Sequence, residues 1–161
     1  MSRNRAPVTA WWKAQELLAR RAHGTRELID KLRLREFPEA EISEAIERLK
    51  AKGLLNDREF AFRLVEELFF RRGWGWYAII PRLRRRGLPA DLCREVCRDF
   101  FDRLEEEELQ AVLERLLEKR RRRENDRRKL YAWLKSRGFR GPEISLALNG
   151  MTDTELSEES A

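Results

Sequence analysis

The chain has 161 residues, of which 42% are hydrophobic and 40% charged, and its formal net charge is +6. This apolar content, with five Trp and eight Phe, is enough for a hydrophobic core, which argues against wholesale disorder. No run approaches the ~20 apolar residues of a membrane span, and the N-terminus lacks the apolar run of a secretion signal. Because two cysteines cannot form a disulfide framework, we expect a cytoplasmic protein.

Apolar residues recur at intervals of three and four along the chain, and good helix formers dominate its composition. In chain order, continuous apolar stripes with this spacing cover residues 42–49, 61–69 and 92–104. Gly53, Gly87 and Gly138 each follow a run that ends in basic residues, which is typical of a helix C-terminus. No segment alternates long enough to predict a strand, so the predicted class is all-α.

The sequence repeats itself when it is shifted by 51 residues. The shift aligns a basic residue, the position of the glycine and the apolar residue after it in three successive copies. The aligned positions are Arg35, Arg86 and Arg137, then Glu36, Gly87 and Gly138, then Phe37, Leu88 and Phe139. Helices share a period by chance, but agreement of the glycine together with its neighbours indicates a threefold duplication.

Each copy is therefore predicted to fold as a unit of three helices, spanning residues 8–53, 55–104 and 106–151. We expect nine helices in an elongated or curved array, because stacked neighbours bury faces that a single unit of this size leaves open. No helix breaker lies between Leu104 and Glu108, so the sequence allows two helices to run together there. The acidic residues 152–161 are expected to form a frayed tail.

Basic residues form clusters that suit a polyanionic partner, since guanidinium groups offer paired donors to phosphate. The alternative is that these arginines are solvated or paired with the abundant glutamates. Trp74 is a further candidate for this interaction surface. The predicted interaction surface consists of Arg71, Arg72, Trp74, Arg82, Arg85, Arg86, Lys119, Arg120, Arg121, Arg122, Arg123, Arg127 and Arg128.

The third copy departs from the other two in its first helix. Lys119 and Arg120 occupy positions that are hydrophobic in both other copies. Either the third unit has exchanged core positions for charge, or its first helix ends sooner.

Trp74 lies between two glycines after a basic pair. An exposed indole there is suited to stacking on a base or anchoring in a partner's pocket. The alternative is a tryptophan that closes the core at a turn, and the sequence favours this alternative for Trp76.

Cys93 and Cys97 have the spacing of a metal-binding pair on one helix face. Their equivalents in the other copies are Ile42 and Ile46, and Ile144 and Leu148, so we expect buried hydrophobes and neither a metal nor another cofactor. A single histidine also excludes zinc sites that need several imidazoles. That residue, His23, falls in a predicted turn and is expected at the surface.

Residues 17–32, 53–89 and 134–139 resemble the RecX family, regulators of the RecA recombinase. The middle segment carries the most specific motifs, which are G-L-L-x-D from Gly53 and an R-x-G-x-G turn that ends at Gly75. The resemblance extends over about residues 10–150, although the charged segment 105–128 departs from it.

This resemblance implies a protein without catalytic residues that binds the RecA filament on single-stranded DNA along its groove. It implies inhibition of the filament's ATPase and strand exchange, filament disassembly, and so a place in DNA repair and recombination. We expect a monomer. Two alternatives remain: a stand-alone nucleic-acid-binding helical protein without base specificity, and a helical scaffold that contacts proteins only.

Overall fold

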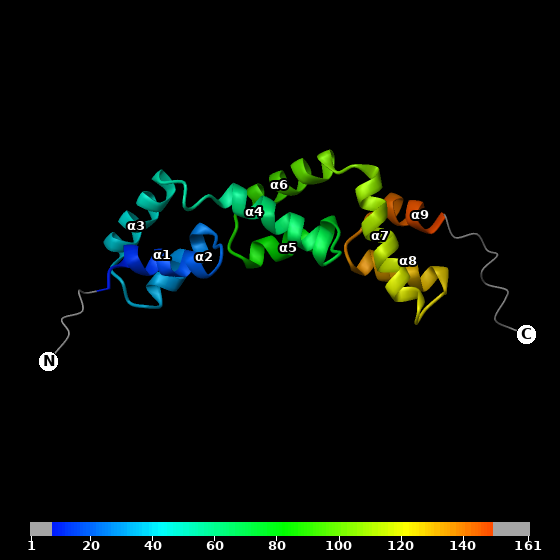
Figure 1. Cartoon of the computed structure of the whole chain (residues 1–161), viewed down its shortest axis with the longest axis horizontal. Coiled ribbons are helices and arrows are strands. Elements are labelled where there is room, and N and C mark those ends of the chain that lie inside the picture. Colours follow the sequence, from blue (N-terminus) through cyan, green and yellow to red (C-terminus); the bar gives the residue numbers. More distant parts are fainter. Residues whose placement is uncertain (1–7, 150–161) are drawn as a thin grey trace, which may run out of the picture.

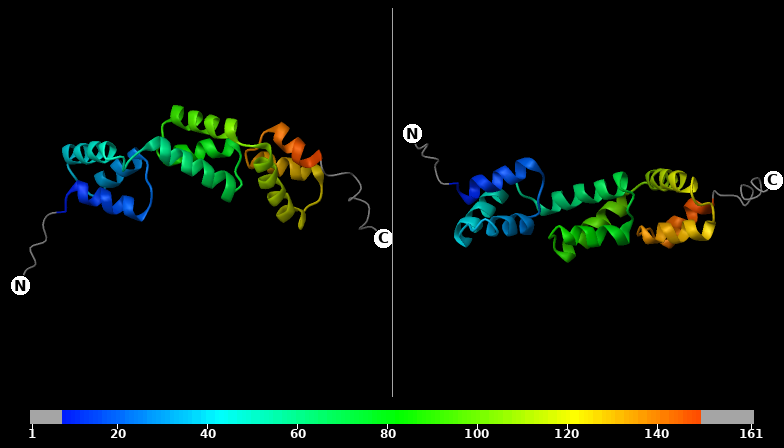
Figure 2. Two further views of the ribbon diagram at one scale, coloured as in Figure 1. Left: turned by 45° about the horizontal axis from the view of Figure 1, so that its top comes forward. Right: turned by 90° about the horizontal axis from the view of Figure 1, so that it is seen from below.

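The computed structural model describes residues 8–149 of the chain. This part contains nine α-helices, one π-helical turn and no strand, which confirms the all-α prediction. The helices follow one another as three units of three along an elongated, gently curved array (Figure 1). Two further views show the same succession along one axis (Figure 2). The predicted acidic tail lies outside the described residues.

The first unit consists of α1 (Ala10–Arg20), α2 (Thr25–Arg33) and α3 (Glu39–Ala51). The hydroxyl of Thr9 starts α1 by accepting a hydrogen bond from the Trp12 amide, at 3.2 Å. The apolar stripes of the three helices face each other and form a core of their own. This core contains Ala14, Leu17, Leu28, Leu32, Ile42, Ile46, Leu49 and Leu55.

The second unit consists of α4 (Asp57–Glu66), the π-helical turn η1 (Glu67–Arg71), α5 (Trp76–Arg85) and α6 (Ala90–Arg103). The Asn56 side chain caps α4 by accepting hydrogen bonds from two backbone amides of its first turn. Because η1 continues α4, the first helix of this unit reaches the turn that carries the R-x-G-x-G motif.

The third unit consists of α7 (Glu106–Arg121), α8 (Arg127–Ser136) and α9 (Gly141–Asn149). The expectation that two helices run together before it is wrong, because α6 ends at Arg103 and α7 begins separately. A reciprocal capping box separates them: the Glu105 side chain accepts from the Glu108 backbone, and the Glu108 side chain accepts from the Glu105 amide.

Helix α7 continues to Arg121 and ends within one aligned position of its counterparts, so Lys119 and Arg120 both lie inside it. Lys119 is exposed and Arg120 is half-buried. Of the aligned residues in the other units, Leu17 and Phe69 are buried, and Leu18 and Leu68 are half-buried. The third unit has therefore exchanged core positions for charge.

The cores of the second and third units are continuous, whereas the first unit keeps a separate core. Phe69 lies at the point of continuity, with its ring centroid 5.4 Å from that of Phe100 and 6.5 Å from that of Phe139. Such edge-on aromatic contacts add to the stabilisation from burial. Units two and three are therefore held by shared apolar packing.

Cys93 and Cys97 are buried, as predicted. Burial raises the pKa of both thiols, that of Cys97 to about 12, so they behave as small hydrophobes. Among residues 8–149, no group of three His, Cys, Asp or Glu side chains is placed to hold a metal ion. Within the same range, none of the helices combines the length and the apolar character that crossing a bilayer requires.

The prediction that His23 lies at the surface is wrong, because only 3% of its surface is exposed. Its Nδ1 lies 2.8 Å from the Arg21 carbonyl oxygen and its Nε2 lies 3.0 Å from the Lys31 ammonium. A neutral ring satisfies both contacts by donating from Nδ1 and accepting at Nε2. Burial lowers the pKa of His23, and the charges of Arg21 and Lys31 lower it further, while the Arg21 carbonyl and Glu27 act in the opposite direction.

This lowered pKa predicts that stability falls as the solution becomes acidic. The unfolded chain binds a proton at His23 more readily than the folded chain does. The contribution of neutral His23 to the free energy of unfolding is therefore complete above about pH 6.5 and is lost as the pH falls below that value. The pKa of neighbouring Glu27 is lowered, so Glu27 stays ionised between pH 7.5 and 5.5. In urea titrations we expect the urea concentration at the unfolding midpoint to decrease as the pH is lowered from 7.5 to 5.5. The decrease should be smaller for His23→Gln than for the wild type. Equal pH dependence in the two proteins would refute the assignment.

Candidate interaction surface at the second joint

The contact between the second and third units, called here the second joint, is a close approach of two backbone turns. The Gly75 amide donates to the Arg137 carbonyl at 2.9 Å, and the Tyr77 amide donates to the Gly138 carbonyl at 3.0 Å. A Cβ on Gly75 would lie 2.6 Å from the Gly138 carbonyl carbon. Gly138 has a φ of 89°, and a Cβ there would lie 2.6 Å from the Ala78 Cβ. Only glycine fits at both positions.

Arginine and tryptophan side chains alternate across this joint. The Arg82 guanidinium lies 3.6 Å from the ring centroid of Trp74, and the Arg137 guanidinium lies 4.2 Å from the same centroid. Arg137 and Arg120 each lie 5.5 Å from the ring centroid of Trp133. These distances permit cation–π attraction. We call the series Arg82, Trp74, Arg137, Trp133 and Arg120 the Arg–Trp ladder.

The ladder accounts for Trp74, for which the sequence left two roles open. Its half-buried ring is covered by two guanidinium groups, so the structure favours a tryptophan that closes the joint over one that stacks on a base. Trp76 is also half-buried, 5.4 Å from the ring of Phe101 and 4.4 Å from the Arg140 guanidinium. It packs against the core, as the sequence favoured.

Arg137 connects the ladder to the backbone of the second unit. Its Nε donates to the Gly73 carbonyl at 2.8 Å, and an Nη donates to the Arg72 carbonyl. Burial lowers the pKa of Arg137, and repulsion from the Arg82 charge lowers it further. Among the described residues, no carboxylate forms an ion pair with Arg82, Arg120 or Arg137. The ladder therefore carries positive charge that its own surroundings do not neutralise.

Of the other predicted arginines, Arg86 and Arg127 have partners within the protein. Arg86 lies 3.4 Å from a carboxylate oxygen of Glu27 and 5.2 Å from the ring centroid of Phe60, so the ion-paired alternative holds for it. Arg127 donates to the Leu148 carbonyl at 3.1 Å and thereby helps to end α9. These two residues have structural roles.

The basic run Lys119 to Arg123, at and just beyond the end of α7, contains both half-buried and exposed side chains. Arg120 and Arg121 are half-buried, and the Nε of each lacks a hydrogen-bond partner among the described atoms. Lys119, Arg122 and Arg123 are exposed.

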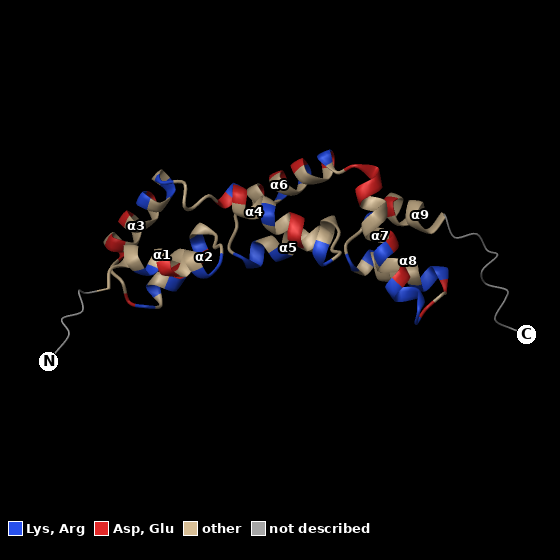
Figure 3. Cartoon of the chain, in the orientation of Figure 1, with Lys and Arg blue, Asp and Glu red and all other residues tan. Residues whose placement is uncertain are grey.

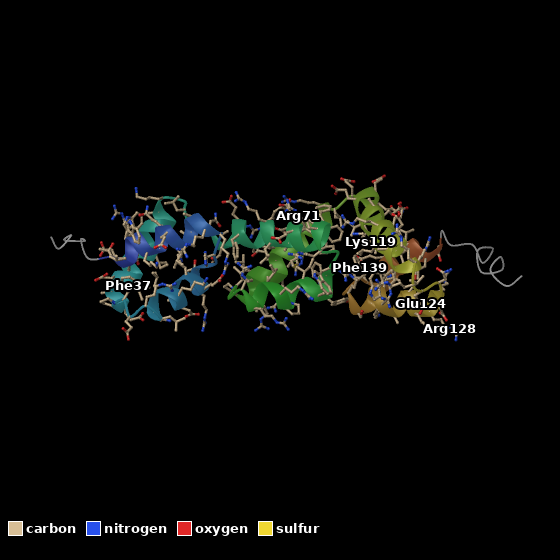
Figure 4. All side chains as sticks on the ribbon, turned by 60° about the horizontal axis from the view of Figure 1, so that its bottom comes forward. Phe37, Arg71, Lys119, Glu124, Arg128 and Phe139 are labelled. Carbon is tan, nitrogen blue, oxygen red and sulfur yellow. The ribbon has the colours of Figure 1, made fainter. Side chains whose placement is uncertain are left out.

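Seven of the predicted residues are exposed and form neither an ion pair nor a side-chain hydrogen bond within residues 8–149, and we call them the exposed cations. They are Arg71, Arg72, Arg85, Lys119, Arg122, Arg123 and Arg128. Arg71, Lys119 and Arg128 are labelled among the side chains in Figure 4. Lys and Arg gather along the lower edge of the array, over α5 and the turn between α7 and α8, while Asp and Glu mark the upper edge where α7 begins (Figure 3).

The sequence interpretation missed Arg137 and Trp133 as members of this surface. A signal for Arg137 was present, since it aligns with Arg86 at a basic position before each glycine turn. No comparable signal identifies Trp133, whose aligned residues are Lys31 and Arg82.

The family model for "RecX, first three-helix domain" matches residues 10–49. The regulatory protein RecX of Chlorobium phaeobacteroides (strain BS1) is 32% identical over 136 residues, which cover 84% of this chain and 89% of that protein. The regulatory protein RecX of Caldanaerobacter subterraneus subsp. tengcongensis is 31% identical over 140 residues, covering 84% and 67%. The crystal structure of RecX from Lactobacillus salivarius superposes with a TM-score of 0.73 at 23% identity, covering 88% of this chain and 93% of that one.

The contacts of Arg137 predict that lysine cannot replace it. Arg137→Lys keeps the charge but loses the planar fork that donates to two carbonyls and lies over two rings, so we expect the free energy of unfolding to fall by about 1–2 kcal/mol. Urea titration followed by tryptophan fluorescence measures the change. Arg85→Lys, at an exposed position, serves as the control and should leave stability unchanged. Equal effects of the two substitutions would contradict a structural role for the ladder.

Proposed function

The chain belongs to the RecX family, and from this premise we propose that it regulates the RecA recombinase by binding the filament that RecA forms on single-stranded DNA. The proposed effect is inhibition of ATPase and strand exchange, followed by filament disassembly. The family membership supports a regulatory role, and the observation that carries the filament partner is the extended array of three units with the exposed cations on its second and third units.

An extended array suits a helical filament because it can contact several protomers at once. Each unit presents helices in a similar arrangement along the array (Figure 2). Linked contacts add avidity, since after the first contact the others form at a high effective concentration. A groove that runs along the filament offers such successive positions. This argument supports binding along the groove.

The exposed cations supply the electrostatic part of the proposal. They lie on the second and third units and have no ion-pair partners among the described residues. Basic surfaces raise the association rate toward a polyanionic partner, and this effect weakens as salt increases. A filament that carries DNA is such a partner. We therefore assign the exposed cations and the Arg–Trp ladder to the side that faces the filament.

Binding changes the recombinase's nucleotide cycle only if it favours one filament state over another. The proposal accordingly requires no catalytic group and no cofactor in this protein. It takes the protein to act as a monomer in the cytoplasm, where its two reduced, buried cysteines are compatible with the environment.

A second candidate function, direct binding of nucleic acid without base specificity, is favoured by the unneutralised charge of the Arg–Trp ladder. Phosphate contacts release counterions, so direct binding would fall steeply with salt. High affinity for single-stranded DNA alone, with no effect on a recombinase, would favour this second candidate.

The direct test is the single-stranded-DNA-dependent ATPase of the cognate recombinase, measured with and without this protein. We expect the rate to fall well below the uninhibited rate when the protein is present in amounts smaller than the recombinase, because one bound copy affects several protomers. An unchanged rate at several-fold excess would refute the proposed function.

The placement of the surface predicts that position matters more than net charge. Arg122→Ser combined with Arg123→Ser removes two exposed cations beyond the packed part of α7. This variant should bind the filament roughly tenfold more weakly, as expected when two exposed ion pairs are lost. Arg98→Ser combined with Arg103→Ser removes the same charge from two exposed positions of α6, and serves as the matched control. Helix α6 itself lies along the upper edge of the array in Figure 3. Both variants should keep wild-type helicity by circular dichroism, and equal loss of affinity would refute the placement.

A further inference from the structure

The contact between the first and second units, called here the first joint, is built from the same repeat positions as the second joint. Gly24 aligns with Gly75, and the glycine turn at Gly87 aligns with Gly138. The basic residue before that turn is also shared, as Arg86 in one joint and Arg137 in the other. The two joints are therefore equivalent contacts between successive repeats, and their geometries can be compared position by position.

The first joint is more open than the second. The two backbone hydrogen bonds that cross the second joint have no counterparts at the aligned amides of Gly24 and Arg26, although these residues belong to the described range. A Cβ on Gly24 would lie 3.3 Å from the Arg86 carbonyl oxygen, whereas a Cβ on Gly75 would lie 2.6 Å from the backbone opposite. The turns of the first joint thus approach each other less closely.

Side-chain contacts hold the first joint where backbone contacts hold the second. The Thr25 amide donates to Oδ1 of Asp57 at 2.7 Å, and Arg86 lies 3.4 Å from Glu27. The apolar core does not continue across this joint, as it does across the second. Fewer and more polar contacts oppose movement of the first unit.

Hollows flank the first joint. One, of about 600 Å³, is lined by Leu18, His23, Leu54 and Phe60, among others. Another, of about 690 Å³, is bordered by residues of α2 and by the glycine turn that precedes α6. Space for the two units to move toward each other is therefore present.

Gly24 gives a further indication of a closer arrangement. Its φ of −75° and ψ of 158° are accessible to any residue, and its surroundings leave room for a methyl group with only a small adjustment. The observed geometry therefore does not require glycine here. The geometry of the second joint does require it, as Gly75 shows.

We propose that the first joint opens and closes, with the second joint as the model of its closed form, while the second and third units move as one body. In the closed form, the backbone amides of Gly24 and Arg26 come within hydrogen-bond distance of the turn at Gly87, as those of Gly75 and Tyr77 do at the second joint. Hinge movement at a joint with few contacts is a common mode of conformational change. The first unit can then adjust its position on a partner surface while the other two keep theirs.

Spin labels at three aligned positions test the movement in the full chain. Ser43, Arg94 and Ser145 are exposed and occupy the same repeat position on α3, α6 and α9. With both native cysteines replaced, labels on the first two report on the first joint, and labels on the last two report on the second. Pulsed electron paramagnetic resonance gives both distance distributions for the free protein, so the result does not depend on the proposed function.

We expect the distribution across the first joint to be roughly twice as broad as that across the second. Gly24→Ala should narrow it, because a methyl group is tolerated in the open form and obstructs the closed form. Unfolding in urea should show that this variant is folded and near wild-type stability. Equally narrow distributions across both joints would overturn the proposal, and so would an unchanged broad distribution in folded Gly24→Ala.

Discussion

At the second joint, two backbone turns approach so closely that the packing of the third unit against the second depends on them. Without side chains at Gly75 and Gly138, the backbones come near enough for two amides to donate across the joint. The same approach lets the aromatic core continue from Phe69 to Phe139, and it places Arg137 where it can reach Trp74. The rigid pair of units and the position of its unneutralised charge both follow from two glycines.

The same constraint explains where the repeats differ. Glu36 has a φ of 60°, a conformation that favours glycine, yet this position carries an exposed side chain. At the other end, Asp126 replaces the glycine of the aligned turns and instead caps α8. Glycine is retained at Gly87 and Gly138, where the preceding unit packs against the turn. Gly53 has a positive φ and nothing within 4 Å of an added Cβ, so the local turn alone favours glycine there, whereas neighbour contact adds a second requirement at Gly87 and Gly138.

The sequence was sufficient to predict the helical class, the repeat and the burial of Cys93 and Cys97, because each of these depends on local spacing or on aligned positions. It did not predict the break before α7, since glutamate is an uncommon N-cap and Glu105 was not recognised as one. It placed His23 at the surface because the burial of a turn residue depends on what packs over it. The Arg–Trp ladder joins residues that are tens of positions apart, and neither periodicity nor composition reveals such contacts.

The stability of Gly75→Ala, measured beside that of Gly24→Ala at the aligned position of the other joint, shows whether backbone contact holds the second joint. If the second joint depends on backbone contact, a methyl group at Gly75 must push the turns apart. The free energy of unfolding from urea titration should then fall by about 2–3 kcal/mol, against less than about 1 kcal/mol for Gly24→Ala. A Gly75→Ala protein as stable as the wild type would show that the second joint does not depend on the close approach of its backbones.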